Sequence, residues 1–275
     1  MIPSALDVHE YEHQAPPMIG IGVPTFGMVS IRWHMCMLSL GMPMNVPSTL
    51  FSVIGAEIGD ARNEIVQRAL AFEHPKTKAR ISHLFFVDDD CLLSTSALRQ
   101  LYEHRKPIMA GLYYTKSTPP EPLILTKKYG GVAHDFTHGD VIPCFAHGMG
   151  ATLIDLDVFR TMYHQGHVDV TDRPCHGCEG KAGDCRACFG TGKVIRWFYT
   201  TKANVTVDEY GPDFRYETED CYFCERAITA GFQPCVDTGV FAFHYDAPNG
   251  EAYPLEQWRQ YRATGRIEWP TAVPA

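Results

Sequence analysis

The sequence has no run of apolar residues as long as the roughly 18 that a membrane-spanning helix requires. Its start, from Met1 to Asp7, lacks the charged and apolar regions of a signal peptide. The formal net charge of −8 gives no overall attraction to nucleic acid or to an anionic membrane, although a local groove can still be basic. We therefore expect a cytoplasmic protein without a membrane span.

Disulfides are not expected, although the chain has 10 cysteines. In a protein that looks cytosolic, cysteines are more often thiols and metal ligands. The 275 residues, 45% hydrophobic and 20% charged, suffice for one large α/β domain or two small ones. The sequence shows no internal repeat.

Four of the cysteines form two Cys-x-x-Cys pairs, Cys175 with Cys178 and Cys185 with Cys188. Four thiolates at this spacing predict a tetrahedral zinc site, and a site with four protein ligands is structural rather than catalytic. Disulfides or a reactive dithiol are the alternatives, and the doubled pattern disfavours both. The glycines around these pairs resemble the cysteine-rich zinc region of J-domain chaperones, over residues 175–192 only.

Three consecutive carboxylates, Asp88, Asp89 and Asp90, follow the apolar run 84–87. Such a run predicts a buried strand whose carboxyl end lies at the rim of a sheet, where α/β proteins bind their ligands. Adjacent acids repel one another unless a cation is near, which indicates a divalent metal. A solvated acidic turn or a helix N-terminus is the alternative.

Strand and helix patterns alternate along the chain. Apolar runs predict strands at 18–23, 49–54, 84–87, 108–114, 151–154, 197–199, 234–240 and 241–243, and helical spacing predicts helices at 29–40, from Asp60 as N-cap, around 97–101, at 157–162 and at 217–232. This alternation predicts an α/β fold with a doubly wound, mostly parallel, Rossmann-like sheet. We divide the chain into an extended arm (1–17), this domain (18–246), an inserted zinc module (170–195) and a tail (247–275).

Polar residues and glycines stand where predicted strands end or helices begin. An arginine in a first helical turn, as at Arg62, can fork onto a phosphate or onto a carboxylate of the acidic triplet, or it can form a surface ion pair. Acids in a first turn also favour the helix dipole, and a lone histidine is usually structural. The positions are Pro24, Thr25, Arg62, Asn63, Gly148, Gly150, Glu219, Asp220 and His244.

Taken in order, these motifs resemble the GT-A-type glycosyltransferases, which use nucleotide sugars. The resemblance covers residues 18–246 apart from the zinc insertion. It rests on Val23-Pro24-Thr25, Ala61-Arg62-Asn63, Phe86-Val87-Asp88-Asp89-Asp90 as the Asp-x-Asp motif, Ala110-Gly111-Leu112-Tyr113, His147-Gly148-Met149-Gly150, Glu219-Asp220, Ala230-Gly231-Phe232 and His244.

The resemblance implies transfer of a sugar from a nucleoside-diphosphate sugar, such as a UDP-sugar, to an acceptor hydroxyl. Asp88, Asp90 and His244 would ligate Mn²⁺ or Mg²⁺. Asp220 would be the general base with Glu219 beside it, which implies inversion at the anomeric carbon. The donor would be bound by Pro24, Thr25, Arg62, Asn63, Asp88, Asp89, Gly148 and Gly150, and the acceptor by Trp197, Phe198 and Tyr199.

The acceptor stays open, because the zinc module replaces a loop that is usually short in this family. It is a glycan or lipid-linked sugar, a protein side chain, or a hydroxymethylated base in DNA. A DNA acceptor needs a flipped base and a basic path for phosphates, and candidates for that path are Arg173, Lys181, Arg186, Lys193 and Arg196.

Two other classes of protein compete with a glycosyltransferase. A nucleotidyltransferase would normally carry a glycine-rich loop with a basic residue after the first strand, and Pro24-Thr25-Phe26-Gly27 is no such loop. A non-enzymatic zinc-knuckle binding protein requires the acids at 88, 90 and 220 to be incidental.

Overall fold

The structure, a computed structural model, describes residues 17–128, 130–208 and 211–266, so nearly all of the predicted arm and the end of the predicted tail lie outside it. Among these residues, none of the helices is long and apolar enough to cross a membrane. The helices are α1 (Ile31–Ser39), α2 (Ile58–Ala71), α3 (Ala97–Glu103), α4 (Leu156–His164), α5 (Glu219–Thr229) and α6 (Leu255–Thr264).

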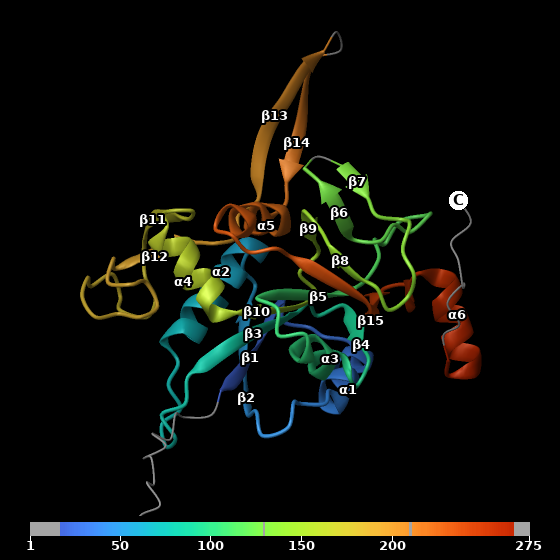
Figure 1. Cartoon of the computed structure of the whole chain (residues 1–275), viewed down its shortest axis with the longest axis horizontal. Helices are drawn as coiled ribbons and strands as arrows, with labels where there is room; N and C mark the ends of the chain where they lie inside the picture. The colour runs from blue at the N-terminus through green and yellow to red at the C-terminus, as the bar shows by residue number, and fades with distance from the viewer. Residues whose placement is uncertain (1–16, 129, 209–210, 267–275) are drawn as a thin grey trace, which may run out of the picture.

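A nine-stranded mixed sheet forms the centre of the molecule (Figure 1). Its strands lie in the order β16 (Glu251–Tyr253), β15 (Cys235–Asp246), β5 (Ile108–Leu112), β10 (Ala151–Asp155), β3 (Ile81–Val87), β1 (Met18–Thr25) and β2 (Ser48–Ile54), and the two strands β4 (Cys91–Leu93) and β8 (Val141–Pro143) also pair with β15. Five strands run in one direction, because β10 is antiparallel to both β3 and β5. The predicted α/β fold with a mostly parallel sheet is confirmed.

Helices cover both faces of this sheet. On β3, Phe85 and Val87 join a core that includes residues of α1, α3 and α6. Leu84 and Phe86 point to the opposite face and join a second core with residues of α2, α4 and α5. This alternation follows from the two-residue period of a strand, and it explains why the run at 84–87 is apolar throughout.

Two glycines let α2 and β2 approach β1 closely. A Cβ atom on Gly20 would lie 2.8 Å from the Phe51 ring, and one on Gly22 would lie 2.8 Å from Ile65 Cγ2. Both distances are too short for real carbon contacts. The glycines of β1 therefore serve packing, and they bring the N-terminal turn of α2 to the end of β3.

Three smaller sheets complete the fold. They are β6 (Ile124–Lys127) with β7 (Gly130–Val132) and β9 (Ala146–His147), β11 (Asp169–Pro174) with β12 (Lys193–Arg196), and the hairpin of β13 (Thr201–Asp208) and β14 (Gly211–Glu217). The hairpin projects from the body of the molecule beside α5 (Figure 1).

Several local predictions were wrong. The side chain that caps α2 belongs to Glu57, which accepts from the Asp60 N–H, so Asp60 lies inside the first turn. The predicted strand at 197–199 is absent, because β12 ends at Arg196. The two strands predicted at 234–243 are one long strand, β15. The hairpin, and the strand and helix within the predicted tail, were not predicted.

Candidate functional site

The acidic triplet lies in a turn rather than on a strand. β3 ends at Val87, and the Cys91 N–H donates to the Asp88 carbonyl oxygen over 3.1 Å to close the turn into β4. Residues two apart on a strand share one face, and we would expect this of Asp88 and Asp90 if the strand continued through the triplet; because they lie in a turn, they do not. The two carboxylates bind different partners.

Arg62 joins Asp88 to the start of α5. Its Nη2 donates to both carboxylate oxygens of Asp88, over 2.8 and 3.0 Å. Its Nη1 donates to Glu219 Oε1 and, over 3.2 Å, to Asp220 Oδ1. Of the alternatives for Arg62, the contact with a carboxylate of the triplet is the one present, and the residue is 1% exposed rather than on the surface. One cation thus holds three acids from two distant parts of the chain.

Burial and charge shift the proton affinities of this group. Burial raises the pKa of the Glu219 carboxyl to about 8, helped by the charge of Asp220 and opposed by Arg62. Burial also raises the pKa of Asp88, although Arg62 acts against it. For Arg62, burial lowers the pKa, but the three carboxylates outweigh this and the net shift is upward. The site therefore has an excess of negative charge, which a proton on Glu219 reduces.

Asp90 faces His244 and Lys116 instead. Its Oδ2 lies 3.2 Å from His244 Nε2 and 2.6 Å from Lys116 Nζ. Burial raises the pKa of Asp90, but hydrogen bonding and charge from His244 and Lys116 hold it at about 2. Asp90 and His244, which are 154 residues apart in the sequence, thus lie close together as predicted.

The orientation of the His244 ring has a chemical consequence. Its Nδ1 lies 2.8 Å from the Tyr114 carbonyl oxygen, which can only accept, so Nδ1 carries a proton. In a neutral imidazole, Nε2 then offers a lone pair to Asp90 Oδ2, which is also an acceptor. Either a second ring proton or a cation between these two atoms relieves the conflict.

Asp88 does not join Asp90 and His244 as a third metal ligand, because both of its carboxylate oxygens accept hydrogen bonds from Arg62. Across the described ranges, four cysteines form the one group of three or more His, Cys, Asp or Glu side chains with ligand atoms close enough for a metal ion. The predicted set of Asp88, Asp90 and His244 is therefore not assembled here.

The third acid, Asp89, binds the turn after β1. Thr25 Oγ1 donates to Asp89 Oδ2 over 2.6 Å, so the two predicted positions lie together. Pro24 is buried within β1. The backbone of the triplet is held from α1, where Trp33 Nε1 donates to the Asp88 carbonyl oxygen over 2.8 Å.

Gly148 and Gly150 are needed for packing against the site. A Cβ atom on Gly150 would lie 2.6 Å from Cys91 Sγ and 3.0 Å from Asp88 Oδ2. One on Gly148 would lie 2.1 Å from the Tyr113 hydroxyl oxygen. That hydroxyl accepts from the Gly150 N–H over 3.0 Å, and the Gly150 carbonyl accepts from the Asp88 N–H. The glycines thus support Asp88 from behind.

Three predicted ligand-binding residues are part of the core. Asn63 is 0% exposed, and its amide group bonds the Phe198 carbonyl oxygen and the N–H groups of Trp197 and Phe198, at 2.8 to 2.9 Å. Trp197 and Phe198 are also 0% exposed. Because these side chains have no surface to offer, Asn63 is not a donor contact, and an aromatic acceptor wall made of all three rings was wrong. Only Tyr199, 40% exposed, remains accessible.

Of the five basic residues proposed as a phosphate path, three form ion pairs and a fourth packs against an aromatic ring. Arg173 donates to both oxygens of Asp60, Arg186 to Glu73 and Lys193 to Asp172. The Arg196 guanidinium lies 4.0 Å from the centre of the Tyr199 ring. These contacts offset most of the positive charge that a DNA acceptor would require.

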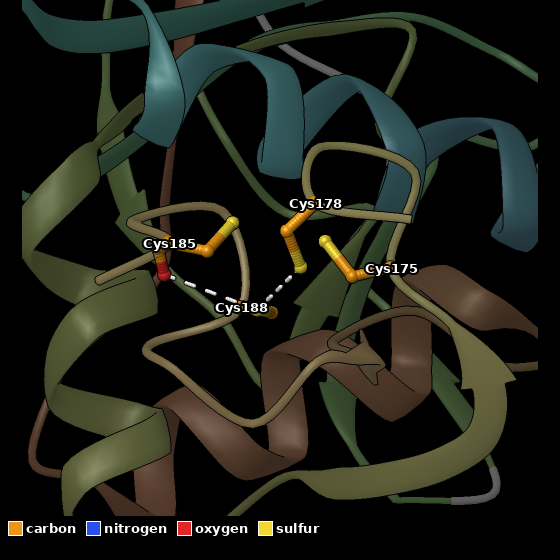
Figure 2. Close-up of side chains that lie close together, drawn as sticks. All are labelled: Cys175, Cys178, Cys185 and Cys188. Atoms are coloured by element: carbon orange, nitrogen blue, oxygen red, sulfur yellow. Dashed lines mark hydrogen bonds between the residues drawn. The ribbon is translucent and has the colours of Figure 1, made fainter. Parts of the chain in front are cut away.

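The four predicted zinc ligands converge (Figure 2). All four sulfur atoms lie within 4.8 Å of one another, and Cys178 Sγ is 3.7 Å from Cys188 Sγ. Tetrahedral zinc with bonds of about 2.3 Å places its sulfur ligands roughly 3.8 Å apart. The cysteine cluster fits a metal ion such as Zn²⁺.

The two Cys-x-x-Cys pairs have matching backbones. Each second cysteine is followed by two residues with positive φ, Glu179-Gly180 at 51° and 81° and Phe189-Gly190 at 49° and 83°. The N–H of Gly180 donates to the Cys175 carbonyl, and that of Gly190 donates to the Cys185 carbonyl. Such paired turns direct sulfur atoms and N–H groups toward one point.

This module rests on α2, the helix that carries Arg62. Gln67 Nε2 lies 3.9 Å from Cys175 Sγ, and the ion pair of Arg173 with Asp60 connects the same two parts. Arg186 pairs with Glu73, which follows the end of α2. Asp60, Arg62 and Gln67 all belong to α2. The cysteine cluster therefore supports the helix that organises the acidic site.

Two residues of the site were missed in the sequence, Trp33 and Lys116, and Tyr113 was quoted within a motif but given no role. All three contact the triplet or its supports, as described above. Tyr113 follows β5 directly and Lys116 comes soon after, so their position at the carboxyl end of a parallel strand was the available signal. Trp33 gave no such signal within its helix.

Comparison with known proteins gives weak similarity only. No protein-family model matches the chain, and none of the curated proteins matches it. Among solved structures it is similar to A197 from STIV, with 14% identity, a TM-score of 0.48 and coverage of 86% of this chain and 92% of that one. It is also similar to residues 1–349 of TarS from S. aureus, with 10% identity, a TM-score of 0.28 and coverage of 65% and 57%. Function must be inferred from the contacts of the site.

Proposed function

We propose that the protein is a metal-dependent glycosyltransferase that moves a sugar from a nucleoside-diphosphate sugar, such as a UDP-sugar, to an acceptor hydroxyl. The observation that carries this proposal is the grouping of carboxylates around Arg62 and Lys116 at the end of β3. The members are Asp88, Asp89, Asp90, Glu219 and Asp220.

The electrostatics of this group favour a cation. With Glu219 protonated, four carboxylates against Arg62 and Lys116 would still repel a diphosphate, so an anionic donor needs positive charge at the site. Asp90 and His244 are the residues that would hold Mn²⁺ or Mg²⁺, with His244 oriented by the Tyr114 carbonyl. When bound, the cation would offset the charge of the nucleoside diphosphate as it leaves.

The chain's own residues position the donor. Arg62 keeps Asp88 fixed at the end of β3, where Asp88 is available to the donor ribose. Thr25 and Asp89 lie together beside the turn after β1, on the side where a nucleotide would bind. Lys116, which now pairs with Asp90, offers a second positive charge for a phosphate oxygen.

We assign the general base to Asp220. Its side chain is 22% exposed, against 10% for that of Glu219. Glu219, with its pKa of about 8, retains a proton at neutral pH and cannot accept one. As the acceptor oxygen bonds to the anomeric carbon, its proton passes to Asp220 and the bond from that carbon to the phosphate oxygen breaks. Attack from the face opposite the leaving group inverts the configuration.

For the acceptor we propose a choice of chemical classes, and for the zinc we propose a structural role. Tyr199, whose ring packs against Tyr222 of α5, is the ring available to an acceptor, which is a glycan, a protein side chain or a hydroxymethylated base in DNA. We propose Zn²⁺ with a structural role for the cysteine cluster, because four protein ligands leave no open position.

Mass-spectrometric screening of nucleotide-sugar hydrolysis tests this function and identifies the donor. With the donor known, Asp220→Asn should bind it normally and lose roughly a hundredfold or more in transfer, as expected for a general base. Glu121→Gln, on an exposed loop, is the matched control. Full transfer by Asp220→Asn would refute the base assignment, and the absence of hydrolysis of every nucleotide sugar would refute the function.

A further inference from the structure

An apolar cavity of about 480 Å³ lies between α1 and α6, over β4 and β15. Its lining includes Leu92, Leu93, Phe241, Phe243 and Trp258. Cavities of this size with mostly apolar walls and few polar groups are typical of small-molecule sites. None of the lining residues belongs to the carboxylate group around Arg62.

The polar groups of this cavity are few. Arg32 lies at its border, with its guanidinium 5.5 Å from the centre of the Trp258 ring. Within the described part of the chain, no carboxylate forms an ion pair with Arg32. This guanidinium can therefore pair with an anionic group of a ligand.

The surface around the cavity is also apolar. On α1, Ile31 and Met35 both line the cavity and are 72% and 58% exposed. With Leu38 they form one stripe of the helix, since residues three and four apart share a face. Of the large hydrophobic side chains found exposed among the described residues, nine of thirteen fall within residues 26–54: Phe26, Met28, Val29, Ile31, Met35, Leu38, Met44, Leu50 and Ile54.

Charged residues are scarce in the same region, and acidic residues are absent from it. From Met18 to Ala56 the chain has no aspartate or glutamate, and Arg32 is its only lysine or arginine. This segment therefore carries +1 in a chain whose net charge is −8. A ligand with an apolar body and an anionic head matches both the walls of the cavity and its single unpaired cation.

We propose that the cavity between α1 and α6 binds an amphipathic lipid with a single apolar chain and an anionic, oxygen-bearing head. The chain lies along Leu92, Phe241 and Phe243, and the head reaches Arg32. The exposed stripe of α1 then faces the lipid surface from which such a ligand comes, or shields the chain of a dissolved one.

Isothermal titration of the full chain with dodecanoate and with the uncharged 1-dodecanol tests the site. The wild type should bind both. Arg32→Gln should weaken dodecanoate binding by roughly fivefold or more, as for a lost charge-assisted bond, and dodecanol binding by much less. Met35→Glu should weaken both, because it places a charge at an apolar border. Arg99→Gln, an exposed arginine on α3, is the matched control.

Flotation with vesicles of phosphatidylcholine, with and without phosphatidylglycerol, distinguishes the sources of the ligand. Flotation that Met35→Glu abolishes assigns it to a bilayer, and dodecanoate binding without flotation assigns it to a dissolved amphiphile. The proposal is overturned if the wild type binds neither probe, or if Arg32→Gln and Met35→Glu bind as well as the wild type. It is also overturned if light scattering shows a dimer that Met35→Glu dissociates without any lipid binding, since a second copy would then cover this face.

Discussion

At the scale of single residues, Arg62 contacts more of the charged groups of the site than any of the acids does. Its guanidinium is buried, and it is the shared partner of Asp88, Glu219 and Asp220. Breaking a buried ion pair by removing one partner leaves an uncompensated charge, which costs far more than the net contribution of the intact pair. Arg62 therefore links the stability of the fold to the geometry of the candidate active site.

Replacing Arg62 should destabilise the protein strongly. We expect Arg62→Met to lower the free energy of unfolding by about 3 to 5 kcal/mol near neutral pH, because Asp88 is left buried without its cation. Urea unfolding followed by circular dichroism measures this change. Arg68→Met removes an exposed arginine of the same helix that pairs with Glu64, and should cost less than about 1 kcal/mol. Similar losses in the two variants would show that the buried cluster is not a structural centre.

Glu219 should make the stability depend on pH. Its pKa rises from an ordinary 4.5 to about 8 in the folded protein. Between these two pH values the unfolded chain has lost the proton and the folded chain has kept it, so stability falls as pH rises, by up to roughly 1.4 kcal/mol per pH unit. In urea unfolding at pH 5 to 9, Glu219→Gln should flatten this decline, and Glu103→Gln, on the exposed end of α3, should not. An unchanged slope in Glu219→Gln would contradict the raised pKa.

The sequence predicted which residues lie close together more successfully than it predicted the role of each residue. Arg62, Asp88, Glu219 and Asp220 were recognised as polar groups at strand and helix ends, and the structure places them in contact. Asn63 had the same kind of position, yet its amide is used entirely by the backbone at Trp197 and Phe198. The difference depends on which way a side chain turns within one helical turn, and that is decided by tertiary packing rather than by local pattern.

At the scale of elements, the apolar runs predicted most strands of the main sheet and the period of the helices. They could not predict that β10 is reversed, because the apolar pattern of a strand is the same in both directions. The hairpin of β13 and β14 was missed because its residues have no long apolar run. The strand predicted at 197–199 is absent because Trp197 and Phe198 are buried by side-chain packing, without a partner strand.

The connection between β9 and β10 should tolerate no side chain at Gly150. Gly150→Ala places a Cβ atom against Cys91 and the Asp88 carboxylate, whereas Gly22→Ala places one against Ile65, away from the triplet. Both variants should lose about 1 to 3 kcal/mol of stability through overpacking. Only Gly150→Ala should also weaken binding of Mn²⁺ with a nucleoside diphosphate, by roughly tenfold or more through misplacement of Asp88. Equal binding by the two variants would separate Gly150 from the site.

At the scale of the whole molecule, two distant parts of the sequence share α2 as a support. The cysteine module contacts this helix through Cys175 at Gln67 and through Arg173 at Asp60, and the acidic site contacts it through Arg62. The spacing of the cysteines predicted their cluster, since four thiolates on two short turns have few other ways to meet. The position of the cluster against α2 depends on ion pairs between residues more than 100 apart, which local patterns do not reveal.

Loss of the metal should loosen α2. The purified protein should contain about one equivalent of zinc, and Cys185→Ser should lose it, because three remaining thiolates bind more weakly. Hydrogen exchange should then become faster along α2 as well as within the module, and the melting temperature should fall. Cys36→Ser changes a cysteine outside the cluster and should leave both unchanged. Slow exchange in α2 after zinc removal would show that the module is independent of the site.

The most direct test of the proposed function is titration of the protein with a panel of nucleoside diphosphates, with Mn²⁺ and with chelator. We predict that one nucleoside diphosphate binds in the presence of Mn²⁺, and that chelator, Asp90→Asn or His244→Ala each abolishes this binding. Failure of every nucleoside diphosphate to bind with Mn²⁺, or equal affinity in chelator, would contradict a metal-dependent glycosyltransferase.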